Sequence, residues 1–220
     1  MAIHIWKDAR YIYIYPALHE RNTRILLNNK NTNLFSNNFY SVIPLEEEKD
    51  KNHLFMEITA DQWVFRRDYR WENNVIRSTN FKAGDILVAS DNLNTKFTGY
   101  MGHSAIVVNE HEMVESPGGD ISIVKAPNEK FIRHHPTYAH YRPLNSELGE
   151  RAAQFALDYY DKYEQNKMNG ENKPIFSFKL SQSLDDPWEY VYCSKLVWLA
   201  YHHGAGYSFK NDFLLFSPED

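Results

Sequence analysis

The sequence contains one cysteine, Cys193, and its position favours a reactive thiol. Leu196, Val197 and Ala200 follow it at the i+3, i+4 and i+7 positions, which places Cys193 in the first turn of an amphipathic helix. The positive end of a helix dipole lowers the pKa of a thiol there, and the thiolate is the nucleophilic form. Free cysteines are also common in protein cores, so position alone leaves an inert buried thiol open.

A nucleophilic thiol needs a base, and His103 stands apart from the other histidines as a candidate. It follows Gly102 and begins an apolar stretch at 104–108, so it lies where a loop enters a buried strand. Functional side chains often occupy such positions, although a core histidine bonded to the backbone fits the same pattern. Glu115 ends a second short apolar stretch, and a charge there needs a partner.

Whether Glu115 reaches His103 depends on the hairpin between these two stretches. An odd loop such as 109–111 pairs Glu115 with Ala105, and Glu115 and His103 are then diagonal neighbours on one face. An even loop places them on opposite faces of the sheet. A Cys–His–Glu triad therefore requires an odd loop or a bulge.

The segments that position these residues predict an α+β domain. Helical spacing predicts one helix from Ser146 to about Tyr163 and another from Cys193 to the glycines Gly204 and Gly206. Residues 175–178 fit a short strand or a helical turn. Apolar stretches between turn signals predict strands at 86–89, 104–108, 113–115, 121–125 and 138–142.

The first eighty residues carry no recognisable motif. β-branched and aromatic residues predict a strand at 11–15. The asparagine-rich stretch 28–38 predicts a loop, and the charged run 46–51 predicts a solvated face or loop. We therefore expect an N-terminal extension or subdomain over 1–80 and a catalytic domain over 81–220.

Four segments of this second region together resemble one family of hydrolases. They read Lys-Ala-Gly-Asp85-Ile-Leu, Gly-His103-Ser-Ala-Ile-Val-Val, Met-Val-Glu115-Ser-Pro-Gly-Gly and Tyr192-Cys193-Ser-Lys-Leu-Val-Trp. In this order they are similar to the circularly permuted papain-like hydrolases of the NlpC superfamily, YiiX/YebB-like branch, in which the histidine precedes the cysteine. The resemblance implies a permuted papain-like (NlpC-type) fold, with an antiparallel sheet packed against the helix that bears the nucleophile.

The resemblance also implies the roles of the site residues. Cys193 is the expected nucleophile, His103 the general base and then acid, and Glu115 the residue that orients the imidazole. The expected reaction is cleavage of an amide, in a peptide, an amidated amino acid or a cell-wall-derived peptide, through a thioester acyl-enzyme. The backbone N–H of Cys193 is the natural oxyanion donor. Tyr192 is a second candidate donor that fits the core equally well, and Asp85 is expected to be structural.

Two other functions stay open on the same fold. Some permuted relatives act on lipid acyl groups and share an Asn-Cys-Glu-His-Phe motif. The segment at 192–196 reads Tyr-Cys-Ser-Lys-Leu, which departs from that motif and favours the amidase or peptidase branch over an acyltransferase. A non-catalytic binding module is the second alternative, and the intact set of cysteine, histidine and glutamate argues against it.

Other chemistries lack their motifs. The histidines at 111, 134–135, 140 and 202–203 have no HExxH or other convincing ligand spacing, and one cysteine excludes zinc sites built from several. Neither G-x-S-x-G nor a P-loop sequence occurs. We therefore expect no metal and no cofactor.

Composition restricts the partners. With 43% hydrophobic and 24% charged residues, the chain has globular composition. A net charge of −5 gives no electrostatic footprint for nucleic acid or anionic lipid. No apolar run approaches the ~20 residues of a membrane span, and the N-terminus does not resemble a signal peptide. The expected partner is a small peptide or amide substrate, and the expected location is the cytoplasm.

Overall fold

The chain divides into two compact units, Met1–Val75 and Ile76–Asp220, and each is described by itself. The sequence places this division after residue 80. The structure is a computed structural model, and it describes residues 4–7, 11–15, 23–28, 30–32, 34–36, 41–44, 53–60, 62–70, 80–89, 102–135, 138–178, 183–210 and 216–217.

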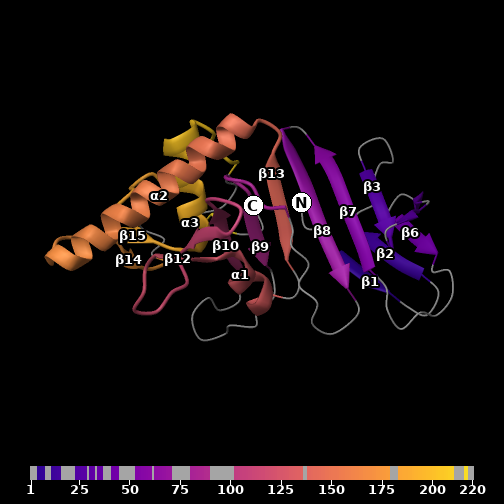
Figure 1. The fold of residues 1–220 in the computed structure, drawn as a ribbon, viewed down its shortest axis with the longest axis horizontal. Helices are drawn as coiled ribbons and strands as arrows, with labels where there is room; N and C mark the ends of the chain where they lie inside the picture. The colour runs from indigo at the N-terminus through magenta and orange to yellow at the C-terminus, as the bar shows by residue number, and fades with distance from the viewer. Residues whose placement is uncertain are drawn as a thin grey trace. The chain divides into compact units, whose positions relative to one another are not determined.

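The described part of the first unit consists of antiparallel strands (Figure 1). Two series of neighbours occur, β1-β2-β6-β5 and β8-β7-β3-β4. Alternate residues of these strands are buried, among them Ile12, Ile14, Leu54 and Met56. The strands are β1 (His4–Lys7), β2 (Tyr11–Tyr15), β3 (Thr23–Leu27), β4 (Lys30–Asn31), β5 (Phe35–Ser36), β6 (Ser41–Pro44), β7 (His53–Ala60) and β8 (Trp63–Arg70).

Strand β2 has the predicted bounds, but the prediction of a loop over 28–38 is wrong. This stretch contains β4 and β5, and β4 pairs back onto the end of β3. Asn28 makes the reversal possible because it takes a left-handed conformation with φ of 52°, which asparagine tolerates better than most residues. The charged run 46–51 lies outside the described residues.

The second unit contains an antiparallel series of strands in the order β12-β11-β10-β9-β13. The bounds are β9 (Ile86–Ala89), β10 (His103–Val107), β11 (Glu112–Glu115), β12 (Val124–Pro127) and β13 (Ala139–Pro143). The strand predicted at 121–125 begins later than expected because Ile121 closes the preceding turn through an isolated bridge to Gly118. A short helix that the sequence analysis did not predict, α1 (Asn128–His134), follows β12 directly.

Two longer helical segments complete this unit. Helix α2 (Ser146–Asn169) is capped by the Asn145 side chain, which accepts a hydrogen bond from the backbone N–H of Glu147 at 3.0 Å. The helix does not end near Tyr163 as predicted. Residues 164–169 lose the apolar periodicity but keep good helix formers, and the chain first leaves the helix at Gly170, with φ of 69°.

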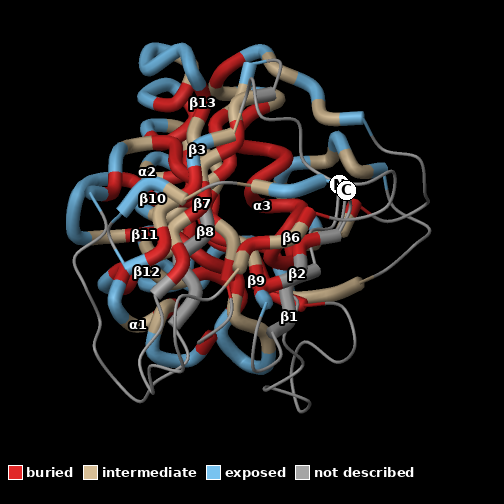
Figure 2. Tube along the Cα trace, turned by 90° about the vertical axis from the view of Figure 1, so that its right-hand side faces the viewer, coloured by how far each residue is buried: buried red, intermediate tan, exposed pale blue. Residues whose placement is uncertain are grey.

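Helix α3 (Cys193–Leu199) begins at Cys193, as predicted, and is buried along its length (Figure 2). It continues as the π-helix η3 (Ala200–Ala205), so Gly204 lies inside the helical segment and Gly206 ends it with φ of 69°. Between α2 and α3, β14 (Ile175–Phe176) and β15 (Tyr190–Val191) form a short parallel pair. The sequence left a short strand and a helical turn open for residues 175–178, and the strand is the one observed.

These elements pack as layers around the strands. Helix α3 packs on β10, and α2 packs along η3. The first turn of α2 approaches the turn before β9 so closely that a Cβ on Gly84 would lie 2.2 Å from Cα of Gly149. The second unit is thus a mixed α+β structure whose antiparallel strands are packed against the helix that begins at Cys193.

Candidate active site

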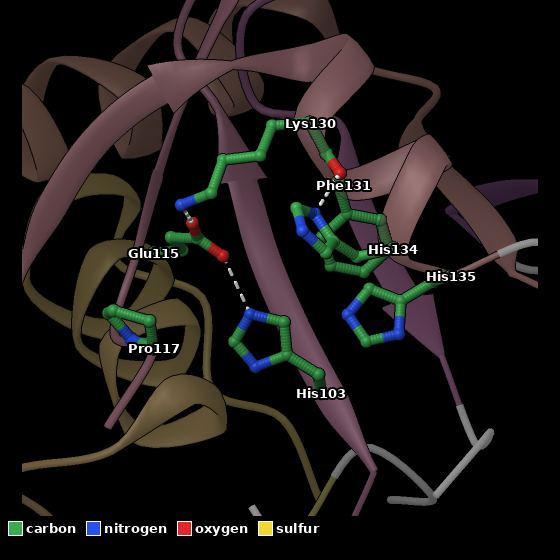
Figure 3. Close-up of a pocket in the computed structure, with 7 residues that line it drawn as sticks. All are labelled: His103, Glu115, Pro117, Lys130, Phe131, His134 and His135. Atoms are coloured by element: carbon green, nitrogen blue, oxygen red, sulfur yellow. Dashed lines mark hydrogen bonds and ion pairs between the residues drawn. The ribbon is translucent and has the colours of Figure 1, made fainter. Parts of the chain in front are cut away.

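The β10–β11 hairpin brings His103 and Glu115 together. Ala105 pairs with Glu115 and Val107 with Met113, and the loop is the odd-length one predicted from the sequence. His103 and Glu115 consequently share a face, and Nε2 of His103 lies 2.7 Å from Oε2 of Glu115 (Figure 3). Both side chains are buried. The predicted register is therefore confirmed.

Asn109 and Asn128 hold the hairpin loop at this length. Oδ1 of Asn109 accepts hydrogen bonds from the backbone N–H groups of His111, at 2.8 Å, and Glu112, at 2.9 Å. From outside the hairpin, Nδ2 of Asn128 donates to the carbonyl oxygens of Asn109, at 3.2 Å, and Glu110, at 3.0 Å. The register that joins His103 to Glu115 therefore depends on a residue of α1.

Helix α1 also supplies a cation that the sequence analysis missed. Nζ of Lys130 lies 2.8 Å from Oε1 of Glu115, so the two carboxylate oxygens have different partners (Figure 3). A signal for this helix was present, because Glu129 lies in its first turn, and Arg133 and His134 lie in its last turn, as the helix dipole favours.

Cys193 is the first residue of α3 and follows Tyr192, whose backbone is extended. The cysteine is 1% exposed. Its Sγ lies 3.8 Å from Oγ of Ser194, and Oγ of Ser194 lies 3.2 Å from Oγ of Ser104 on β10. These contacts attach the start of the helix to the strand that bears His103.

The site is assembled from both faces of the sheet. Ala105 and Val107 belong to the same apolar cluster as Phe131 of α1, and the ring of His103 lies 5.5 Å from that of Phe131. Ser104 points to the opposite face, toward α3. His103 is the first residue of β10, and its imidazole also interacts with the Cys193 thiol.

The three groups shift one another's pKa values against the effect of burial. Burial alone would lower the pKa of His103, but its interactions with Cys193 and Glu115 raise it to about 9. Burial would raise the pKa of Glu115, yet His103 and Lys130 lower it to about 2. Burial would also raise the pKa of the Cys193 thiol, and the interaction with His103 instead holds it below its usual value. These interactions favour the thiolate of Cys193 and the imidazolium of His103 over their neutral forms.

A pocket reaches this site from the side of the imidazole and the carboxylate. Its lining comes from β10, β11 and α1, and includes His135, whose ring stacks 5.3 Å from that of His103. Cys193 is not part of the lining, and the sulfur is covered in this conformation. The full lining is His103, Glu115, Pro117, Lys130, Phe131, His134 and His135 (Figure 3).

The two remaining residues singled out from the sequence have different surroundings. Tyr192 is buried, and its ring lies 5.2 Å from that of Phe178. Asp85 is fully buried and belongs to a separate ionic cluster, in which Nε of Arg142 donates to Oδ1 at 2.7 Å and Nε2 of His140 lies 2.7 Å from Oδ2. Asp85 thus joins the start of β9 to β13 and does not contact the Cys193–His103–Glu115 group.

Comparison of the chain with protein-family models, with curated proteins and with solved structures finds no match. Within the part of the chain that the structure describes, no helix combines the length and the apolar character that crossing a membrane requires.

Proposed function

We propose that residues 81–220 form a cysteine hydrolase of the circularly permuted papain-like type, which cleaves an amide through a thioester acyl-enzyme. The observation that carries the proposal is the buried row of Cys193, His103 and Glu115, in which each group favours the charged form of the next. A buried cysteine of purely structural use gains nothing from a partner that stabilises its thiolate. Catalysis by covalent attack requires that partner.

In the proposed reaction, the Cys193 thiolate attacks the amide carbonyl carbon and forms a C–S bond. The tetrahedral intermediate collapses as the C–N bond breaks and the His103 imidazolium gives its proton to the leaving nitrogen. His103, now neutral, takes a proton from water, and the hydroxide attacks the thioester. The C–S bond then breaks, the carboxylic acid leaves, and the thiolate and imidazolium are restored.

Glu115 is proposed to orient the imidazole. Its hydrogen bond occupies Nε2 of His103, so Nδ1 is the nitrogen left to serve the sulfur and the leaving group. Nδ1 is buried, and among the described residues it has no hydrogen-bond partner of good geometry. The backbone N–H of Cys193, in the first turn of α3, has no acceptor within the helix and is the proposed oxyanion donor.

The proposed substrate is a small peptide or an amidated amino acid. A panel of peptide amides and acyl esters, assayed with the wild-type protein and with Cys193→Ala and His103→Ala side by side, tests the activity. Each variant should lose turnover completely, and the double variant should be no worse than either one, because residues that act as one unit are not additive. Mass spectrometry should detect an acylated Cys193 peptide during turnover.

Turnover by Cys193→Ala at the wild-type rate would refute the proposal. Turnover of acyl esters but not of amides, with the same loss in both variants, would assign the site to acyl-ester chemistry instead.

A further inference from the structure

Three metal-ligating side chains meet in the second unit, outside the site described above. They are Asp185, in the segment before β15, and His202 and His203, which are neighbours in η3. Oδ1 of Asp185 lies 3.1 Å from Nε2 of His203 and 3.5 Å from Nε2 of His202. One ligand atom of each residue lies within 4.8 Å of the ligand atoms of the other two.

The two separations from Asp185 are close to those of zinc coordination. Zinc binds histidine nitrogen and carboxylate oxygen at about 2.0–2.2 Å, usually in a tetrahedron, so two ligand atoms of one ion lie about 3.3–3.5 Å apart. The distance from Oδ1 of Asp185 to Nε2 of His203 is 3.1 Å, slightly below this range. The distance to Nε2 of His202 is 3.5 Å, at its upper limit. The ligand atoms of His202 and His203 lie within 4.8 Å of each other, so movement of these partly exposed side chains has to complete the tetrahedral geometry.

Neighbouring groups contact both imidazoles, and Nε2 of His203 also lies 3.3 Å from the backbone carbonyl oxygen of Asp185. Nδ1 of His202 is hydrogen-bonded to Oγ of Ser208 at 2.8 Å, which leaves Nε2 as the free coordinating nitrogen when Nδ1 carries the proton. The ring of His202 also stacks on Trp198 with centroids 4.2 Å apart, and the ring of His203 stacks on Phe155 at 5.9 Å.

The two histidines are consecutive residues in the π-helix, and the rings of both approach the carboxylate of Asp185. Single-turn π-helical segments are rare and frequently mark functional sites.

We propose that Asp185, His202 and His203 bind one Zn²⁺ ion, with water as the fourth ligand. The ion connects the segment that leads through β15 to Cys193 with the far end of the helix that Cys193 begins. The proposal stands independently of the hydrolase activity. The competing explanation is a pair of ordinary histidine–aspartate ion pairs, which bind no metal.

Zinc binding to metal-free protein tests this directly. The measurements use a Cys193→Ala background, because a thiolate beside an imidazole also attracts zinc. Competition with a chromogenic chelator should give one Zn²⁺ per chain, and saturating zinc should raise the Tm. Asp185→Asn and His203→Gln should each weaken binding at least about 10-fold and abolish the rise in Tm. Ser208→Ala, which removes the partner of His202, should weaken binding about 10-fold.

His111→Ala is the matched control, because His111 is an exposed histidine on the β10–β11 loop. It should bind zinc as tightly as the background protein. The Tm of each metal-free variant shows whether it is folded, and a tetrahedral Co²⁺ spectrum in the background protein gives a readout that needs no further variant. Absence of stoichiometric binding, or equal binding by Asp185→Asn and His203→Gln, would overturn the proposal.

Discussion

At the scale of residues, the proposed catalytic group depends on charges that burial opposes. An isolated buried histidine favours its neutral form, as do an isolated buried thiol and a buried carboxyl group. In the proposed ionised state, the thiolate of Cys193, the imidazolium of His103, the carboxylate of Glu115 and the ammonium of Lys130 follow one another with alternating sign. Each charge is tolerated because the next one compensates it, so removal of any member should change the ionisation of its neighbours.

The first prediction concerns the alkylation of Cys193. In His103→Ala, iodoacetamide should label the thiol at pH 7 at least about 10-fold more slowly than in the wild type, because an ordinary thiol is only a few per cent thiolate. Alanine opens space next to the sulfur, so poorer access cannot explain a slower reaction. Labelling rates are followed by mass spectrometry on this single cysteine.

His135→Ala is the control for this experiment, since it removes a buried imidazole that stacks on His103 without removing the proposed base. It should react at the wild-type rate or faster. Labelling of His103→Ala as fast as the wild type would indicate an inert core cysteine.

The second prediction concerns the pKa of His103. The wild-type value is about 9, and the negative charge of Glu115 contributes to raising it. Glu115→Gln retains a hydrogen-bonding group but removes the charge, so the pKa of His103 should fall by about 1 unit or more. The alkaline limb of kcat/KM should move to lower pH with it, because imidazolium then deprotonates earlier. NMR titration of the histidine signals measures the pKa without a substrate.

Lys130→Ala provides the comparison that separates charge from packing. It disturbs the same carboxylate but leaves Glu115 negative and removes a nearby positive charge. The pKa of His103 should therefore remain raised in this variant. A fall in Lys130→Ala equal to that in Glu115→Gln would mean that loss of packing, and not of charge, lowers the value.

At the scale of elements, the predictions that the structure confirms rest on local sequence patterns. The bounds of β9 and the start of α3 are confirmed because apolar runs and helical spacing define them within a few neighbouring residues. The His103–Glu115 contact is confirmed because the period of a strand links loop parity to the face of the sheet.

The features that the sequence analysis missed depend on contacts between distant segments. Helix α1 was not predicted because it is short and lacks a side-chain cap, and Lys130 was missed because it belongs to this helix. The proximity of Asp185 to His202 and His203 joins two distant segments, so the spacing of the histidines does not predict it. The late end of α2 reflects helix propensity without an apolar stripe.

The third prediction tests the support of the β10–β11 loop by α1. Asn128→Ala removes both hydrogen bonds from Nδ2 to the part-buried loop carbonyl groups. It should lower the free energy of unfolding by about 1–3 kcal/mol and reduce any catalytic rate, because the register of Glu115 loosens. Urea denaturation measures the change in stability.

Glu110→Ala is the matched control at this loop, because Asn128 contacts only the backbone oxygen of residue 110 and the glutamate side chain is exposed. Its free energy of unfolding should stay within about 0.5 kcal/mol of the wild type. If the two variants are equally stable, the hydrogen bonds from Asn128 do not hold the loop.

At the scale of the whole molecule, both proposed sites belong to one of the two units. Cys193, His103 and Glu115 lie in the unit Ile76–Asp220, as do the proposed zinc ligands. The described strands of Met1–Val75 bury an aliphatic core of their own. The division between the units thus separates a strand-built part from the part that carries the polar chemistry.

The alternating row of charges also has a consequence for how molecules approach the site. The whole chain carries a net charge of −5, but in the proposed ionised state the two negative and two positive groups of the row cancel. Mobile ions screen long-range attraction over about 10 Å at 0.1 M salt and have little to screen for an uncharged substrate. For an uncharged substrate, kcat/KM should therefore change less than about twofold between about 10 mM and about 500 mM NaCl. Lys130→Ala leaves the row with an excess negative charge, and encounter with a cationic peptide should then slow measurably as salt is added.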